Sequence, residues 1–180
     1  MKKNTFKQAV LINIIGLVIL VGLTLFVPKR LSSSTHFTND HYSSDLMVKK
    51  AAIYNVLQKY NSPLTGEIDA FLNACMTYNI DCYLLPSISG VESTFGRFLM
   101  PGSYNPFGWG GGHIYFESWE DGFNQVGKGL KENYFGQGLT SIEEVGSVYA
   151  ASPAWPSKVH HYLSMFTAEE AKINLSILEL

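Results

Sequence analysis

Charged residues are scarce in this sequence. They account for 16% of the 180 residues, whereas a typical soluble domain contains about 25%. This low share, together with 13% aromatic residues, excludes a disordered or highly charged tail protein. The length leaves room for one ordinary domain with a single hydrophobic core and a short additional segment.

Acidic residues are absent from the first thirty positions, although the net charge of the whole chain is only −2. Five of the 13 basic residues lie in this segment, which leaves 8 basic and 15 acidic residues in the remainder, a net charge of −7 there. The five are Lys2, Lys3, Lys7, Lys29 and Arg30. An acidic remainder argues against a nucleic-acid partner.

An apolar run between the two basic groups predicts a membrane segment. Residues 9–27 contain only Asn13 and Thr24 as polar residues, and as a helix they would extend over roughly 28 Å, the thickness of a bilayer core. We expect an uncleaved signal anchor, with residues 1–8 in the cytoplasm and the rest of the chain outside the membrane. A cleaved signal peptide is the alternative, although its apolar core is usually shorter, about 7–15 residues. In both cases the domain is exported.

The part of the chain after the membrane segment divides into a linker, a domain and a tail. Residues 28–45 are rich in Ser, Thr, Asn and Asp and lack apolar periodicity, which predicts a linker. From Leu46 the apolar spacing becomes helical. We therefore predict one domain over residues 46–168 and a C-terminal tail over residues 169–180.

Helical periodicity returns several times within the predicted domain. Thr65, Ser118 and either Thr140 or Ser141 are predicted N-caps of its helices. Residues 97–116 are rich in glycine, proline and aromatic side chains, and we expect them to form a loop with at most a short hairpin. The predicted fold class is α+β, mainly α, with one small loop or β lobe.

Glu92 is the strongest candidate for acid–base chemistry. It is the only acidic residue between Asp81 and Glu117, and it is predicted on a helix with apolar neighbours, one turn before the aromatic loop. Partial desolvation would raise the pKa of its carboxyl group and make it a competent general acid near neutral pH. Glycosidic cleavage needs such a proton donor. The spacing alone fits an ordinary exposed glutamate equally well.

Four sequence blocks together resemble a known family. Residues 88–96 are similar to a Glu-Ser-x-x-Gly motif, and residues 105–110 to an Asn-x-Phe-Gly motif. Residues 116–121 resemble a Tyr-Asp-Ser-Trp-Glu-Glu segment, and residues 149–155 a Tyr-Ala-Thr-Asp-Pro-x-Tyr-Ala stretch. In this order the blocks resemble the bacterial endo-β-N-acetylglucosaminidase branch of the lysozyme-like superfamily. The ordered set, over about residues 65–166, is more specific than any one block.

The resemblance implies a lysozyme-like fold and cleavage of peptidoglycan glycan strands at N-acetylglucosamine. It also implies that Glu92 is the general acid and that Tyr149 acts near the scissile sugar. The implied substrate-binding residues, which would line the sugar subsites, are Asn105, Phe107, Trp109 and Trp155. Without the family, Tyr149 and Trp109 fit core aromatic residues better.

The sequence departs from the family in its second carboxylate. No Asp or Glu lies between Ser93 and Phe116, and the next acid, Glu117, is predicted at the start of a helix, where it also complements the helix dipole. Inverting and retaining hydrolysis both use a second carboxylate. Without one, the N-acetyl group of the substrate could act as the nucleophile, or the sugar could close on itself in a transglycosylation.

Three functions are expected from the resemblance and from the missing second carboxylate. A membrane-anchored glucosaminidase comes first. A lytic transglycosylase comes second, because residues 97–112 lack the Gly-Leu-Met-Gln block of that branch. A catalytically inactive peptidoglycan-binding module is a third alternative, motivated by the missing second carboxylate.

The histidine and cysteine residues of the sequence indicate no metal site, and we expect no cofactor. His160 and His161 are adjacent, so on a helix they point about 100° apart and are poorly placed to share a metal. Cys75 and Cys82 are the only cysteines. Outside the membrane they are compatible with a disulfide bond, and equally with two buried free thiols.

Overall fold

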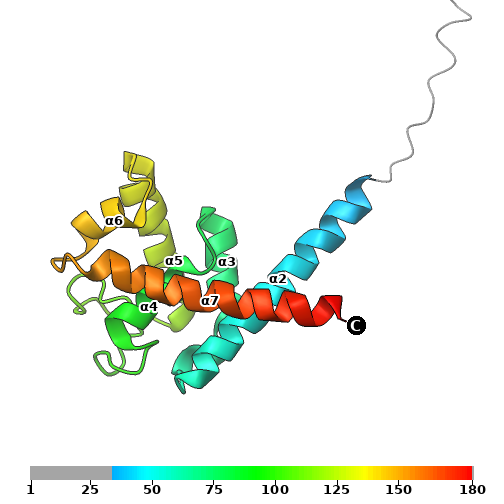
Figure 1. The fold of residues 1–180 in the computed structure, drawn as a ribbon. Helices are drawn as coiled ribbons and strands as arrows, with labels where there is room; N and C mark the ends of the chain where they lie inside the picture. The colour runs from blue at the N-terminus through cyan, green and yellow to red at the C-terminus, as the bar shows by residue number, and fades with distance from the viewer. Residues whose placement is uncertain (1–33, 180) are drawn as a thin grey trace, which may run out of the picture. The chain divides into compact units, whose positions relative to one another are not determined.

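The computed structural model describes residues 34–179 of the chain. The chain divides into two compact units, Met1–Asn39 and Asp40–Leu180, and all predicted site residues lie in the second. The described helical elements are α2 (Ser34–Lys59), the 3₁₀ turn η1 (Pro63–Gly66), α3 (Ile68–Tyr78), α4 (Leu84–Ser93), α5 (Trp119–Gly129), the π-helical turn η2 (Leu130–Tyr134), the 3₁₀ turn η3 (Phe135–Gln137), α6 (Ile142–Tyr149) and α7 (Trp155–Leu178) (Figure 1).

None of the helices within residues 34–179 is both long and apolar enough to cross a membrane. The predicted anchor, residues 9–27, and the predicted cytoplasmic segment, residues 1–8, lie outside the described residues. The first part of the predicted linker, residues 28–33, lies outside them as well.

The predicted linker is helical from Ser34 onward, because α2 begins there. Its polar segment has weak helix propensity, at a cost of a few tenths of a kcal/mol per Ser, Thr or Asn. Extending a helix that already exists needs no new nucleation, however. The packed stretch after Leu46 supplies that helix, and Lys49 pairs with Asp45 one turn earlier, at 3.5 Å.

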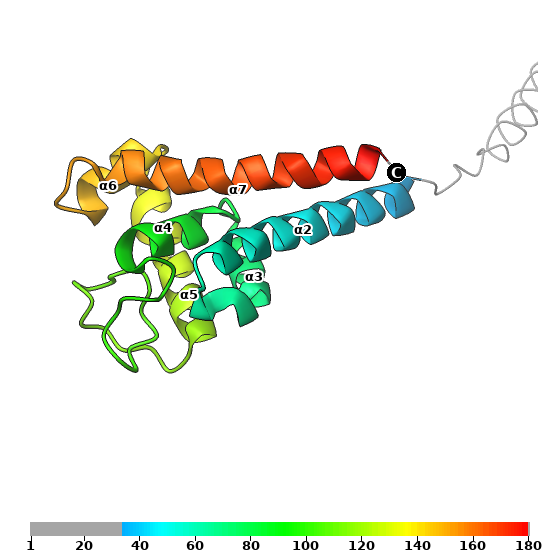
Figure 2. The ribbon, with the colours of Figure 1, turned by 60° about the horizontal axis from the view of Figure 1, so that its bottom comes forward.

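The predicted C-terminal tail, residues 169–180, is helical as far as Leu178, where α7 ends. Glu169 accepts a hydrogen bond from Lys59 at 2.8 Å, and Glu170 accepts one from Lys49 at 2.9 Å. These bonds hold α7 beside α2 (Figure 2). Tertiary pairing therefore orders a segment whose apolar periodicity is weak.

Two of the predicted helix starts are confirmed by their caps. Ser118 accepts a hydrogen bond from the backbone of α5, and Ser141 forms a capping box with Glu144 at the start of α6. Thr65, in contrast, does not cap α3. Ser62 caps the short turn η1 instead, and α3 begins only after it.

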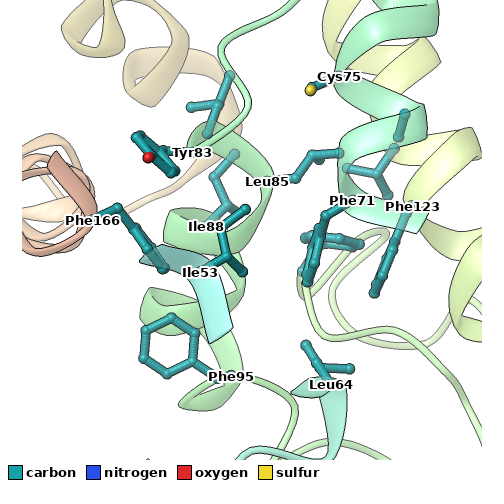
Figure 3. Packing of buried hydrophobic residues seen from close by; sticks show 14 of the residues in the cluster. Ile53, Leu64, Phe71, Cys75, Tyr83, Leu85, Ile88, Phe95, Phe123 and Phe166 are labelled. Carbon is teal, nitrogen blue, oxygen red and sulfur yellow. The ribbon is translucent and has the colours of Figure 1, made fainter. Parts of the chain in front are cut away.

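The core is built around α4. Every residue from Leu84 to Gly90 is buried, and aromatic side chains from the surrounding helices pack against this helix (Figure 3). Phe166 of α7 stacks on Tyr83, with ring centroids 5.4 Å apart, and Phe71 of α3 stacks on Phe123 of α5 at 4.0 Å. The burial of α4 fixes the position of its last turn, where Glu92 lies.

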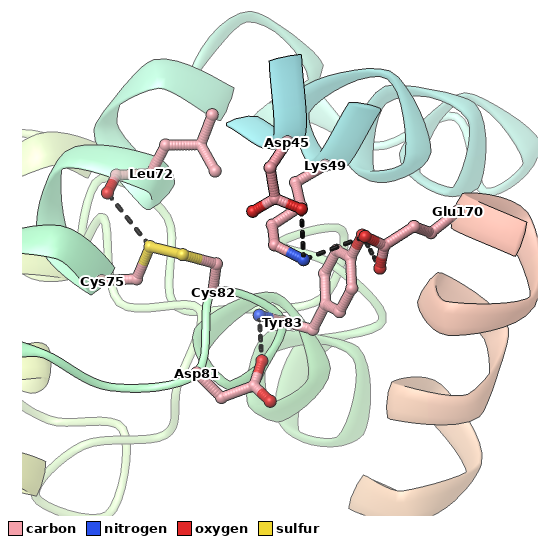
Figure 4. The surroundings of a disulfide bond; sticks show 8 residues. All are labelled: Asp45, Lys49, Leu72, Cys75, Asp81, Cys82, Tyr83 and Glu170. Atoms are coloured by element: carbon pink, nitrogen blue, oxygen red, sulfur yellow. Dashed lines mark hydrogen bonds and ion pairs between the residues drawn. A yellow bond between two sulfur atoms is a disulfide. The ribbon is translucent and has the colours of Figure 1, made fainter. Parts of the chain in front are cut away.

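The disulfide bond between Cys75 and Cys82 is present, and it joins the end of α3 to the segment before α4. The next residue, Tyr83, donates a hydrogen bond to Glu170 of α7 at 2.8 Å, and the ammonium group of Lys49 lies 5.2 Å from its ring centroid (Figure 4). Burial, and then the hydrogen bond to Glu170, raise the pKa of the Tyr83 hydroxyl. The first turn of α4 is therefore held from three sides.

The predicted lobe between α4 and α5 is a loop, and residues 34–179 contain no β-strand, so the β part of the predicted fold class is corrected. Phe116 donates a backbone hydrogen bond to Ser103 at 2.8 Å, which ties the two sides of the loop together. Several glycines adopt positive φ there, and prolines interrupt the chain. Such residues weaken a strand, which explains the absence of a ladder. The mainly α prediction is confirmed.

Candidate functional site

Glu92 lies in the last turn of α4, where the chain reverses into the loop. Thr94 and Phe95 both adopt left-handed backbone conformations, with φ of 50° and 58°. The neighbouring Ser93 donates a hydrogen bond to the carbonyl of Pro106 at 2.7 Å. These contacts bring the central part of the loop back over the end of the helix.

The carboxyl group of Glu92 is held by two features distant in sequence. Trp155, the first residue of α7, donates its indole N–H to Glu92 Oε1 at 2.7 Å. From the loop, Gly108 approaches so closely that a Cβ there would lie 3.0 Å from Glu92 Oε2. Gly108 has a φ of +62°, so glycine serves both the backbone conformation and the close approach.

Burial raises the pKa of the Glu92 carboxyl group, although the residue as a whole is exposed. The two observations agree, since the side chain opens to solvent on one side while its carboxyl group lies against Trp155 and Gly108. The hydrogen bond from Trp155 and the charge of Lys158 act in the opposite direction, but burial outweighs them. The carboxyl group therefore holds its proton to a higher pH than an ordinary glutamate.

Tyr149 reaches the same place from the end of α6. Its hydroxyl donates a hydrogen bond to the backbone carbonyl of Phe107 at 2.8 Å, which connects α6 to the loop. Its ring stacks on Trp155 with centroids 4.9 Å apart and lies 5.7 Å from that of Trp109. Burial, and then the charge of Glu92, raise the pKa of this hydroxyl, so it stays protonated and can keep donating.

A cleft of about 300 Å³ opens beside these side chains. This is the lower end of the size range of small-molecule sites. Its lining residues are Val91, Glu92, Gly108, Tyr149, Ala150, Ala151, Ser152, Trp155 and Lys158. Two larger clefts, of about 470 and 500 Å³, contain neither Glu92 nor Tyr149. The small cleft is the candidate active site because the perturbed carboxyl group lies in it.

Two of the predicted substrate-binding residues, Asn105 and Phe107, have buried side chains. Asn105 is 3% exposed, and its side chain donates to the carbonyls of Trp109 and Ile114 and accepts from the amide of Trp109. Phe107 is fully buried against Phe123. Neither residue is among those that line this cleft, and both side chains are buried. They hold the loop in its conformation.

The two predicted tryptophans differ in their positions. Trp155 lines the cleft, but it is only 2% exposed, and its indole ring is used to hold Glu92 and Tyr149. Trp109 is half-buried and packs against Tyr134, with ring centroids 6.2 Å apart. It contacts the aromatic cluster behind the cleft rather than lining the cleft.

Glu117, the candidate second carboxylate, is exposed and does not line the cleft. Its backbone amide donates to Asp121 in the first turn of α5, which fits a role at the helix terminus. His160 pairs with Glu143 at 2.9 Å, and no group of three or more potential metal ligands occurs in the described part of the chain. The site contains one acid and no metal-ligand cluster among these residues.

Gly108 and Lys158 are site residues that the sequence analysis did not single out. Gly108 is part of the Asn-x-Phe-Gly block, so its position was available as a signal. Lys158 follows the last block by three residues, and nothing in its local pattern sets it apart from other exposed lysines.

No model of a known protein family matches this chain, and no characterised protein matches it significantly. The resemblance to the glucosaminidases therefore rests on the four short blocks, of which three contribute residues to the cleft, through Glu92, Gly108 and Tyr149.

Proposed function

We propose that this protein is a glycosidase that cleaves peptidoglycan glycan strands at N-acetylglucosamine, with Glu92 as the general acid. A single observation carries the proposal. The carboxyl group of Glu92 lies in a cleft, holds a hydrogen bond from Trp155 and has a raised pKa caused by burial. A glycosidase needs such a carboxylic acid to protonate the leaving oxygen. The lysozyme-like fold and the membrane anchor belong to the same proposal.

The mechanism uses one protein acid. Glu92 is the one acid among the residues that line the cleft. In the proposed reaction Glu92 gives its proton to the glycosidic oxygen as the bond to C1 of N-acetylglucosamine breaks. The acetamido oxygen of the same sugar forms a bond to C1. Water then attacks C1 and releases the acetamido group, while the Glu92 carboxylate takes the proton of the water. The protein is regenerated with its proton in place.

The rest of the site would orient this acid. Trp155 fixes one carboxyl oxygen, and the stacking of Tyr149 on Trp155 fixes the indole ring in turn. The hydrogen bond from Tyr149 to the Phe107 carbonyl holds the loop that contains Gly108. Tyr149 is therefore a positioning residue in this proposal, with its ring forming one wall of the cleft.

A lytic transglycosylase is the second candidate, favoured by the same lack of a further acid in the cleft. Glu92 would again protonate the glycosidic oxygen. The 6-hydroxyl of the muramyl residue would then attack its own C1 and give its proton to the Glu92 carboxylate, with an anhydro sugar as the product. An inactive peptidoglycan-binding module would need neither step.

Analysis of the products from purified sacculi tests these candidates. The glucosaminidase proposal expects new reducing N-acetylglucosamine ends. Anhydro-muramic ends would replace it with the transglycosylase. If no fragment is released while the protein still sediments with peptidoglycan, both enzymatic proposals fail and a binding module remains.

A further inference from the structure

Lys158 is the one positively charged side chain among the described residues that line the cleft. It is exposed, and its ammonium group forms no ion pair or hydrogen bond with another residue of the described chain. Its charge nevertheless reaches Glu92, because it lowers the pKa of that carboxyl group against the effect of burial. The cleft thus contains one proton donor and one free cation.

The place of Lys158 in α7 explains why it faces the cleft. Its backbone amide donates to the carbonyl of Ala154 at 3.2 Å, which closes the first turn of the helix. Residues three apart on a helix lie on the same side, so Lys158 is beside Trp155, which holds Glu92. The side chain is therefore oriented by the same element that orients the acid.

Local structure does not favour a cation at Lys158. The first turn of α7 contains no acidic residue, and the start of a helix disfavours positive charge. Within the described residues, Glu92 in the same cleft is the acid on which the charge of Lys158 acts, and no hydrogen bond or ion pair joins the two. An anionic group of a ligand would give the ammonium group a directly bonded partner.

The proposed substrate carries such a group. Of the two sugars in peptidoglycan, N-acetylglucosamine is neutral, whereas N-acetylmuramic acid has a lactyl substituent that ends in a carboxylate when no stem peptide is attached. An ammonium group binds a carboxylate through charge-assisted hydrogen bonds, which are stronger than those between neutral groups. Stem peptides carry carboxylates too, but further from the glycan.

We propose that Lys158 binds the lactyl carboxylate of a muramyl residue beside the scissile bond, so that the cleft selects peptide-free glycan strands. This inference rests on the proposed function for the identity of the ligand. It assigns Lys158 as the residue that determines specificity, and it names glycan from which the stem peptides have been removed as the preferred substrate.

Binding to three glycans of equal length tests the proposal. The ligands are peptide-free muramyl glycan, the same glycan with stem peptides, and a neutral N-acetylglucosamine oligomer. Calorimetry with the full-length protein in a Glu92→Gln background prevents cleavage during the measurement. We expect peptide-free glycan to bind about tenfold more tightly than the neutral oligomer. Adding Lys158→Met should remove this preference, whereas Lys158→Arg should keep most of it.

Lys128→Met is the matched control, because Lys128 is exposed on α5 and does not line the cleft. Equal loss of affinity for all three ligands in Lys158→Met would overturn the proposal, and so would a preference for peptide-bearing glycan. Cleavage assays of the parent protein separate this inference from the proposed function. Cleavage without a preference for peptide-free glycan refutes only the role of Lys158. A Lys158-dependent preference without cleavage refutes only the proposed enzymatic activity. Absence of glycan binding refutes both.

Discussion

Replacing Gly108 with alanine tests how the loop controls the candidate proton donor. The new Cβ would lie 3.0 Å from Glu92 Oε2 and 3.6 Å from Glu92 Cδ, whereas carbon prefers contacts of about 3.5–4.0 Å. The carboxyl group, which also accepts the hydrogen bond from Trp155, would have to move by a few tenths of an ångström. Because misplacement by about 1 Å can cost a hundredfold in rate, we expect turnover to fall by about tenfold.

Gly102→Ala supplies a matched control for the backbone. Gly102 lies in the same loop with a φ of +74°, close to the +62° of Gly108, but nothing lies within 4 Å of a Cβ built there. Left-handed conformation costs an L-residue about 1–2 kcal/mol, so both variants should lose about that much free energy of unfolding. Only Gly108→Ala should also lose turnover.

Two measurements on each variant separate these effects. Urea denaturation gives the free energy of unfolding, and release of soluble fragments from sacculi gives turnover. Equal loss of turnover in both variants would refute the reasoning, because the loop would then act through its rigidity rather than through contact with Glu92. Full turnover in Gly108→Ala would refute the close approach itself.

Three further changes test the disulfide bond, the candidate acid Glu92 and the pairing of α7 with α2. Replacing both Cys75 and Cys82 with serine should lower the free energy of unfolding, measured by urea denaturation, by about 2–3 kcal/mol. The reason is that the disulfide bond closes a loop between residues seven apart. Trp155→Phe removes a hydrogen bond that favours ionised Glu92. The alkaline limb of the pH–rate profile, where the acid loses its proton, should therefore move to higher pH. Glu169→Gln should lower the free energy of unfolding by about 0.5–1 kcal/mol at neutral pH. Lys59 lowers the pKa of Glu169 in the folded protein. This loss should therefore shrink as the pH falls below about 4.3, the ordinary glutamate pKa, and vanish below the lowered pKa of the folded state. Urea denaturation at neutral and at acidic pH measures it.

Each of these three predictions has a result that would contradict it. If the disulfide bond stabilises the fold, the double cysteine variant should be as stable as the parent treated with reductant. A variant as stable as the oxidised parent would contradict this. A limb that stays in place or moves to lower pH in Trp155→Phe would show that Glu92 is not the titrating acid. A stability loss in Glu169→Gln that persists at low pH would assign it to packing rather than to charge.

Much of the fold could be predicted from local signals in the sequence. Ser118 and Ser141 are helix caps in the predicted places because capping depends on residues within one turn. The polar helical segment after Ser34 and the end of α7 could not be predicted in this way. Glu169 and Glu170 are held by Lys59 and Lys49, which lie more than a hundred residues earlier in the chain.

The candidate site was predictable in its residue types but not in its arrangement. Glu92 stood out because acids are rare around it, and Tyr149 because of the block in which it lies. The bond between Glu92 and Trp155 joins residues 63 apart in sequence. Asn105 belongs to a motif, yet only its three hydrogen bonds to the loop backbone reveal that it supports the loop.

The rate at which Glu92→Gln releases fragments from sacculi, relative to the parent protein, tests the role of Glu92 most directly. Glutamine keeps the size of the side chain but cannot donate the proton, so the rate should fall by about a hundredfold or more. Binding to peptidoglycan should persist. Glu117→Gln, outside the cleft, should cut at close to the parental rate. A Glu92→Gln variant that releases fragments as fast as the parent would contradict the assignment of Glu92 as the general acid.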